Sequence, residues 1–164
     1  MTNELVVAPS HSAPGDGAAV WHLGMLLTFK ATTEATGGRC WVKELDAPRG
    51  AATPRHVHSR EDEAFYVLDG EVSLYLGDDV LRASAGTFAW GPRSLPHAFR
   101  VESETAKMLV IGTPGGFDRF FFDTGTQATR RTLPPQPTAP PALEAIVAAA
   151  RRHGVDIIGP PPAP

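Results

Sequence analysis

The chain has 164 residues, of which 42% are hydrophobic and 20% charged, and its formal net charge is −3. This length fits one domain with a buried core. The slightly negative charge gives no basic field for nucleic acid, and no apolar run reaches the roughly 18 residues that cross a bilayer. One cysteine, Cys40, excludes an internal disulfide framework. Without a recognisable signal peptide, we expect a cytoplasmic protein with no nucleic-acid or membrane partner.

Short apolar segments rich in β-branched and aromatic residues follow one another at a spacing of about 8–12 residues. In chain order they are 21–29, 40–45, 65–68, 72–76, 80–81, 87–90 and 108–111. Turn sequences separate several of them, such as Asp69-Gly70 and Gly77-Asp78-Asp79. This rhythm is typical of an antiparallel sandwich or barrel, so we predict an all-β fold.

Composition divides the chain into three regions. Residues 1–18 are rich in Ala, Pro, Ser and Gly, which predicts a flexible or swapped N-terminal arm. The strand-like segments indicate a β-barrel over 19–124, which ends with an amphipathic turn or short helix at 117–122. Residues 125–164 combine a proline-rich connector with a helix at 143–152, whose apolar face we expect to pack on the barrel.

Four residues in the middle of the chain indicate a metal site. His56 and His58 alternate along a strand, so both imidazoles project from the same face. Glu63 follows after a short turn and can return along the neighbouring strand as an oxygen ligand. His97 is the candidate for a fourth donor. Each feature alone has an ordinary explanation, but three imidazoles and a carboxylate on a β scaffold predict a bound metal.

The spacing of these residues resembles the first motif of the cupin superfamily. That motif has a glycine, five residues, His-x-His, four residues, a glutamate, six residues and a glycine. Gly50, His56, His58, Glu63 and Gly70 match every defining position.

A looser second motif follows at the expected distance. Gly86, Pro92 and His97 are correctly spaced, but Ser94 replaces a glycine and Val101 replaces an asparagine. The resemblance implies a conical antiparallel β-barrel, also described as a double-stranded β-helix or jelly roll, with short C-terminal helices. It further implies one divalent metal held by three histidines and one glutamate, and frequent dimerisation.

A weaker resemblance over 21–124, extending to 155–160, points to the quercetin 2,3-dioxygenase-like group of single-domain cupins. It implies a metal-dependent dioxygenase that cleaves a flavonol or another enolisable aromatic substrate. His56, His58, Glu63 and His97 would hold Fe, Ni, Mn, Co, Cu or Zn with an open coordination position. Glu63 would also be the catalytic base that takes a proton from the enolic hydroxyl, after which the enolate meets dioxygen.

Two other functions fit the same residues. The metal could act only as a Lewis acid in a cyclase or isomerase of a polyketide-like or sugar substrate, with no dioxygen consumed. The chain could also be a non-catalytic small-molecule-binding cupin, because fold alone does not decide function.

Aromatic and aliphatic side chains near the expected metal are candidates for a substrate pocket, with ordinary core packing as the alternative. The candidates are Phe65, Val67, Trp90, Phe99 and Phe120. The aromatic run 120–122 could form a lid, although three consecutive side chains cannot all face one way. For assembly we predict a homodimer in which the β-prone segment 21–29 adds to the partner's sheet.

Overall fold

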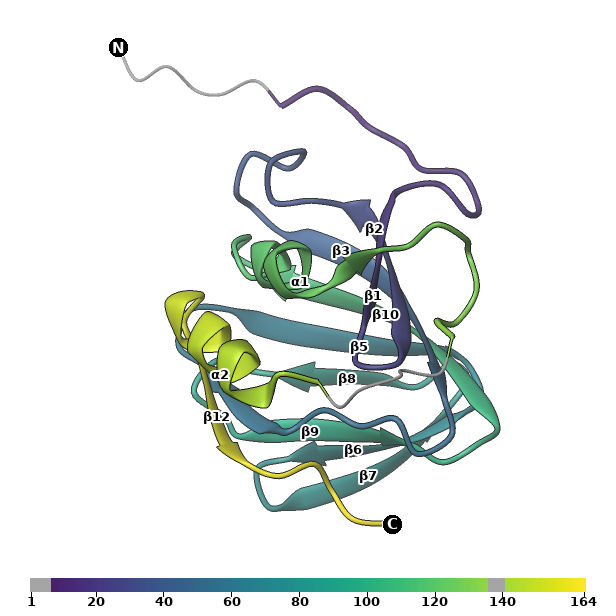
Figure 1. Ribbon diagram of the computed structural model, residues 1–164, viewed down its shortest axis with the longest axis vertical. Helices are drawn as coiled ribbons and strands as arrows, with labels where there is room; N and C mark the ends of the chain where they lie inside the picture. Colours follow the sequence, from purple (N-terminus) through teal and green to yellow (C-terminus); the bar gives the residue numbers. More distant parts are fainter. Residues whose placement is uncertain (1–6, 136–140) are drawn as a thin grey trace.

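Two antiparallel sheets make up most of the molecule (Figure 1). The computed structural model describes residues 7–135 and 141–164. The first sheet has the strand order β11-β1-β2-β3-β10-β5-β8, and the second has β12-β4-β9-β6-β7. The strands are β1 (Ala18–His22), β2 (Met25–Ala31), β3 (Trp41–Pro48), β4 (Arg55–His58), β5 (Asp62–Asp69), β6 (Glu71–Leu76), β7 (Asp79–Ser84), β8 (Phe88–Gly91), β9 (His97–Val101), β10 (Thr105–Thr113), β11 (Thr126–Gln127) and β12 (Val155–Gly159).

This arrangement confirms the predicted all-β jelly roll with short helices. Inward-facing apolar side chains of the two sheets form one core cluster, which includes Leu27, Trp41, Val67, Leu74 and Met108. In the described part of the chain the hydrogen bonds form two separate sheets, so no continuous ladder closes the barrel. The interior is therefore bounded by two facing sheets.

The apolar run 21–29 is a hairpin rather than one strand. Leu23 and Gly24 form its turn with φ angles of 49° and 81°, and His22 pairs with Met25 across it. Two consecutive residues with positive φ give the tight turn that matches the twist of paired strands. The hairpin places His22 at the end of β1, where it faces the interior.

The same hairpin is fully paired within its own chain. β1 pairs with β11 on one side, and β2 pairs with β3 on the other. The segment is therefore not a free edge for a partner's sheet, which corrects the predicted route to a dimer. The homodimer itself stays a prediction.

The described part of the N-terminal arm lies against β2. The Ser12 hydroxyl donates to the Lys30 carbonyl at 2.9 Å, and the Lys30 ammonium donates to the Ala13 carbonyl at 3.0 Å. These contacts hold the segment before β1 on its own chain. The first six residues of the predicted arm lie outside the described residues.

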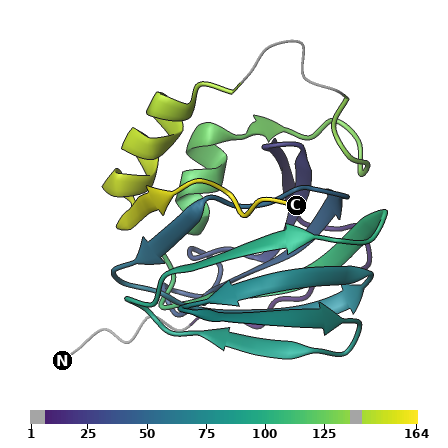
Figure 2. The same ribbon diagram turned by 90° about the horizontal axis from the view of Figure 1, so that it is seen from below.

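Two helices lie beside each other on one side of the strands (Figure 2). They are α1 (Asp118–Thr124) and α2 (Leu143–Arg152). An Asp123 carboxylate oxygen lies 2.7 Å from His153 Nε2, which joins the two helices. The buried face of α2 carries Ala149 and Ala150, whereas Leu143, expected on that face, is 59% exposed. None of the helices in the described ranges is long and apolar enough to cross a membrane.

The C-terminal region adds strands to both sheets as well as a helix. β11 extends the first sheet beside β1, and β12 pairs with β4 at the edge of the second sheet. In this pairing Val155 lies opposite His58 and Ile157 opposite His56. Backbone from the end of the chain therefore holds the strand that carries both histidines. Residues 136–140 of the predicted connector lie outside the described residues.

Candidate metal centre

Three neighbouring strands bring the four predicted donors together. His56 and His58 lie on β4, Glu63 on β5 and His97 on β9, and His56 pairs directly with His97. One nitrogen or oxygen atom from each residue lies within 4.8 Å of the others. The alternation of side chains along β4 turns both of its histidines inward, as the sequence indicated. The four residues are separated by up to 41 positions in the sequence. Pairing of β4 with β9 brings the histidines together, and β5 of the facing sheet adds Glu63.

The carboxylate of Glu63 lies among the three rings. Its Oε2 atom is 3.0 Å from His97 Nε2 and 3.6 Å from His58 Nε2. The His56 and His97 ring centroids are 4.3 Å apart. His58, Glu63 and His97 are buried, and His56 is partly exposed toward the cavity.

Backbone carbonyls orient two of the imidazoles. His56 Nδ1 lies 2.7 Å from the Pro54 oxygen, and His97 Nδ1 lies 3.0 Å from the Leu95 oxygen. A carbonyl only accepts hydrogen bonds, so Nδ1 carries the proton in both rings. Nε2 is then the nitrogen left for ligation; in His97 it lies 3.0 Å from Glu63 Oε2, which accepts its hydrogen bond while no metal is bound. Such a contact fixes both ring orientation and tautomer for metal ligation.

Glu61 is a buried carboxylate beside His58 that the sequence analysis did not select. Its Oε2 atom lies 3.5 Å from His58 Nδ1, and its side chain is only 2% exposed. Of the three acidic residues at 61–63, the sequence analysis selected only Glu63 as a ligand. The signal that could have found Glu61 is its position three residues after His58 across a tight turn. A carboxylate behind a ligating imidazole raises its basicity and fixes its direction.

The middle residue of the same run has a different partner. Asp62 accepts hydrogen bonds from the Arg93 backbone at 2.7 Å and from its guanidinium at 3.0 and 2.9 Å. The side-chain hydrogen bonds of Arg93 lower the pKa of Asp62 to about 2. This contact joins the start of β5 to the loop before β9, and so connects the segments that carry Glu63 and His97.

The electrostatics of the cluster favour an ionised Glu63. Burial acts to raise its pKa, but the charge of His58 and the hydrogen bond and charge of His97 outweigh it and hold the pKa well below its usual range. Burial likewise opposes protonation of His97, yet the hydrogen bond that His97 donates to the Glu63 carboxylate, together with the charge of that carboxylate, raises the pKa of His97. Burial, with His97 and His58 nearby, lowers the pKa of His56 to about 3. Glu63 is thus an ionised carboxylate within the cluster.

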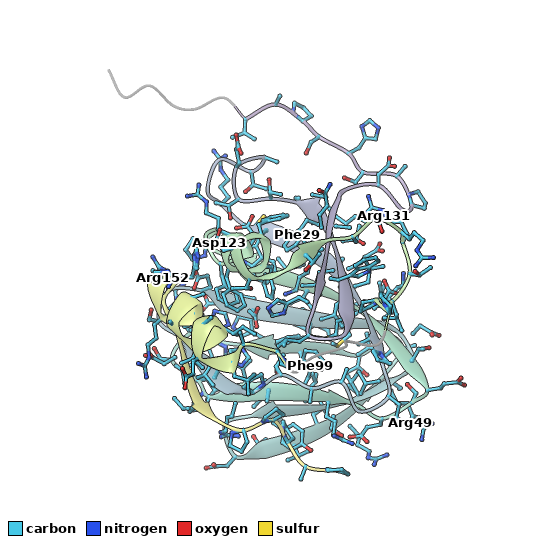
Figure 3. The ribbon with its side chains drawn as sticks, in the orientation of Figure 1. Phe29, Arg49, Phe99, Asp123, Arg131 and Arg152 are labelled. Atoms are coloured by element: carbon cyan, nitrogen blue, oxygen red, sulfur yellow. The ribbon has the colours of Figure 1, made fainter. Side chains whose placement is uncertain are left out.

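A cavity adjoins the cluster, with about 80 Å³ of room for the centre of a water molecule. His56, Glu63 and His97 lie in its wall, and the rest of the wall is mostly apolar. Three of the expected pocket residues line it, namely Phe65, Phe99 and Phe120. Phe99 lies among the strands, whereas Arg49 and Arg152 lie at the periphery (Figure 3).

Two expected pocket residues lie elsewhere. Val67 is fully buried in the core and does not line the cavity. Trp90 is 46% exposed, because Ala89 and Gly91 are the residues of β8 that turn inward. The alternation along β8 therefore places Trp90 on the outer face, which corrects the expectation. On α1, Phe120 and Phe121 line the cavity and Phe122 is half-exposed, so the three rings do not act together as a lid.

Two polar residues that the sequence analysis did not select also line the cavity. His22 ends β1, and Lys43 lies on the inward face of β3 between Trp41 and Leu45. Burial, with Lys43 nearby, lowers the pKa of His22 to about 4. Burial also lowers the pKa of Lys43 to about 8, although Glu63 opposes this shift. The sequence feature that could have revealed Lys43 is its position, a lysine on the inward face of the predicted strand 40–45.

Comparison with known proteins points to the same family as the two sequence motifs around His56 and His97. Residues 44–112 match the cupin domain family. Together with the two-sheet fold, this match identifies a cupin domain in the middle part of the chain.

Over most of its length the chain is similar to two quercetin 2,3-dioxygenases. It is 26% identical over 141 residues to quercetin 2,3-dioxygenase of Bacillus subtilis (strain 168), covering 83% of this chain and 42% of that protein. It is 28% identical over 149 residues to quercetin 2,3-dioxygenase of Aspergillus japonicus, covering 82% of this chain and 43% of that protein. The chain thus spans less than half the length of these relatives. Among solved structures, KdgF from Halomonas sp. matches with a TM-score of 0.60 and 19% identity, over 68% of this chain and 98% of that one, a likeness of fold.

The departure at Ser94 from the second cupin motif leads to a stability prediction. Ser94 has a φ of 66°, in the left-handed region, and its backbone N–H donates to the His58 carbonyl at 2.8 Å. A Cβ atom in this conformation costs about 1–2 kcal/mol, partly offset by the greater unfolded-state freedom of glycine. We expect Ser94→Gly to raise the free energy of unfolding by about 0.5–1 kcal/mol. Urea unfolding measures this change.

The control is Ser84→Gly, at an exposed strand position whose φ is not left-handed. At this position glycine only increases the conformational entropy of the unfolded chain, so the free energy of unfolding should fall. Equal losses in both variants would contradict the strain assigned to Ser94.

The lowered pKa of His22 predicts a pH dependence of stability. The pKa of His22 is about 4 in the folded protein, below the ordinary histidine pKa of 6.5 that applies in the unfolded chain. Between these values the unfolded state binds more protons, so stability falls as the pH falls. Replacing His22 with phenylalanine removes this contribution, up to about 1.4 kcal/mol per pH unit.

The measurement is urea unfolding of wild type and His22→Phe at several pH values between 4 and 6.5. The wild-type free energy of unfolding should decrease more steeply toward acid. His11→Phe, at an exposed position, is the control. Parallel curves for wild type and His22→Phe would refute the assignment.

Proposed function

We propose that this chain is a metal-dependent dioxygenase that cleaves a flavonol or another enolisable aromatic substrate. In this proposal His56, His58, Glu63 and His97 hold one divalent transition metal. The observation that carries it is the convergence of three imidazoles and one carboxylate on the wall of an apolar, aromatic-lined cavity. The similarity to two quercetin 2,3-dioxygenases supports this reaction class.

The donors fit a metal in their chemistry and in their surroundings. Both ring nitrogens of His58 are buried without a hydrogen-bond partner among the described residues. An unpaired buried nitrogen costs free energy, which ligation at Nε2 would recover. Three neutral imidazoles and one carboxylate suit divalent first-row metals. When bound, such an ion would supply Lewis acidity and an open position for chemistry with dioxygen.

Glu63 is the residue we assign as the proton acceptor. Its low pKa keeps the carboxylate ionised at neutral pH, the state that a base requires. A weak base accepts a proton readily only from a fairly acidic donor. An enol or a phenol is acidic enough to serve, whereas an ordinary alcohol is a much poorer donor. The electrostatics of Glu63 therefore favour an enolisable aromatic over a sugar hydroxyl as the substrate group.

The cavity wall suits a flat apolar molecule. Phe65 and Phe99 lie on strands beside the cluster, while Phe117 and Phe120 come from the segment around α1. The rings of Phe117 and Phe120 are stacked with centroids 4.9 Å apart, and Phe117 meets the edge of His58 at 4.7 Å. These rings exclude water near Glu63 and orient a planar ring by stacking.

The ligand assignment predicts the metal content of a variant. His58→Ala removes an imidazole that no neighbouring side chain can replace, so tight metal binding should be lost. The fold should survive, because burial of the apolar core stabilises it. The measurements are elemental analysis and thermal unfolding of the purified protein. Wild-type metal content in folded His58→Ala would show that the ligand set is wrong.

The role of Glu63 predicts a separation of binding from turnover. Glu63→Gln keeps the size and an oxygen donor but removes the basicity. We expect the metal to remain at reduced affinity and dioxygen uptake with quercetin to fall by about 10²-fold or more. An oxygen electrode and elemental analysis on the same sample measure both quantities.

Two outcomes would overturn these assignments. Near-wild-type oxygen uptake by metal-loaded Glu63→Gln would refute the base. Metal-loaded wild type that converts an enolisable aromatic without consuming dioxygen would replace the dioxygenase with a cyclase or isomerase.

A further inference from the structure

A second polar pair lies in the cavity, outside the four-donor cluster. His22 comes from β1 and Lys43 from β3, and both line the same cavity as His56, Glu63 and His97. Their side chains are buried, with residue exposures of 6% and 4%. Both residues lie before the segment that matches the cupin family, which begins at residue 44.

His22 has no hydrogen-bond partner for either ring nitrogen among the described residues. Its ring instead meets Phe120 and Phe121 edge-on, with centroids 5.4 and 5.5 Å away. Burying an unpaired imidazole costs free energy that a phenylalanine in the same position would avoid. A neutral imidazole offers one donor and one acceptor. A ligand hydroxyl or oxyanion entering the cavity would satisfy them.

Lys43 places a positive charge on the same wall. Its ammonium lies 3.5 Å from the ring centroid of Phe121 and 4.8 Å from that of Trp41. Glu63 and Asp118 act on it electrostatically, but the ion pairs formed among the described residues do not include Lys43. Asp118 is instead bound to the backbone N–H and hydroxyl of Thr33. The hydrogen-bond donors of the Lys43 ammonium are therefore free to bind a ligand.

We propose that His22 and Lys43 form an oxyanion subsite that binds a phenolate oxygen of the aromatic ligand whose other end faces the four-donor cluster. The inference rests on the proposed function, because it takes the cavity as the substrate site. It deepens that function by naming the substrate class, an aromatic molecule with an acidic hydroxyl remote from the group that meets Glu63. An ammonium hydrogen bond to an oxyanion is about twice as strong as a neutral one. The pair would thus select hydroxylated aromatics over unsubstituted ones.

The probe is 2,4-dinitrophenolate, which is ionised at neutral pH and whose absorbance reports its environment. We expect the purified, metal-containing protein to bind it, and Lys43→Met to weaken binding by about 10-fold or more, the effect of removing a charged hydrogen bond. His22→Phe should also weaken binding while raising the Tm. Metal content should be unchanged in both variants. Lys107→Met, at a more exposed lysine of β10, is the matched control and should bind as wild type does.

Three results would contradict the proposed subsite. Wild type that does not bind the probe overturns it, as does equal affinity in wild type, Lys43→Met and His22→Phe. A loss of binding confined to His58→Ala would place the phenolate on the cluster and also overturn it. The test needs neither dioxygen nor turnover. If the probe binds through Lys43 but no flavonol supports oxygen uptake, the subsite stands and the dioxygenase proposal fails.

Discussion

The pairing of β4 with β9 and β12 is the constraint on which the site depends. It places His56 opposite His97 on one side and opposite Ile157 on the other, so both edges of β4 are held by backbone hydrogen bonds. β4 is only four residues long, and an isolated strand of that length has no stable structure of its own. Because side chains alternate along a strand, a shift of one residue would turn both histidines out of the interior. The C-terminal strand therefore contributes to the cluster without supplying a donor.

Burial then determines how the polar groups of the interior behave. Two carboxylates, four imidazoles and an ammonium lie among aromatic and aliphatic side chains, where each charge needs a partner. Glu63 obtains one from His97, and two imidazoles are oriented by backbone carbonyls. The Glu61 carboxylate lies 3.5 Å from His58 Nδ1 but forms no hydrogen bond with it. His22 and Lys43 are the members of this set whose neighbours are mainly aromatic rings. This contrast is the physical reason to assign them to a ligand.

The cavity is built from two kinds of segment. Strands within the family match carry Glu63, the three histidines, Phe65 and Phe99. The β1–β2 hairpin, α1 and the C-terminal region lie outside it and supply His22, Phe120 and Ile146 to the wall. Chemistry thus comes from the shared part of the fold, and the shape and polarity of the rest of the cavity come from the flanking segments. Two cupins with the same four donors can in this way accept different substrates.

The sequence by itself determined the strand rhythm, the four candidate donors and the resemblance to the cupins, because alternation and fixed motif spacing are local properties. It also identified Phe65 and Phe99, which share strand parity with a neighbouring donor. Trp90 was misplaced because the alternation within β8 becomes known only once its pairing with β5 is set. Glu61, His22 and Lys43 were missed because their importance lies in what surrounds them. Their partners come from other strands and helices, so only the tertiary structure decides which buried polar groups are paired and which remain free for a ligand.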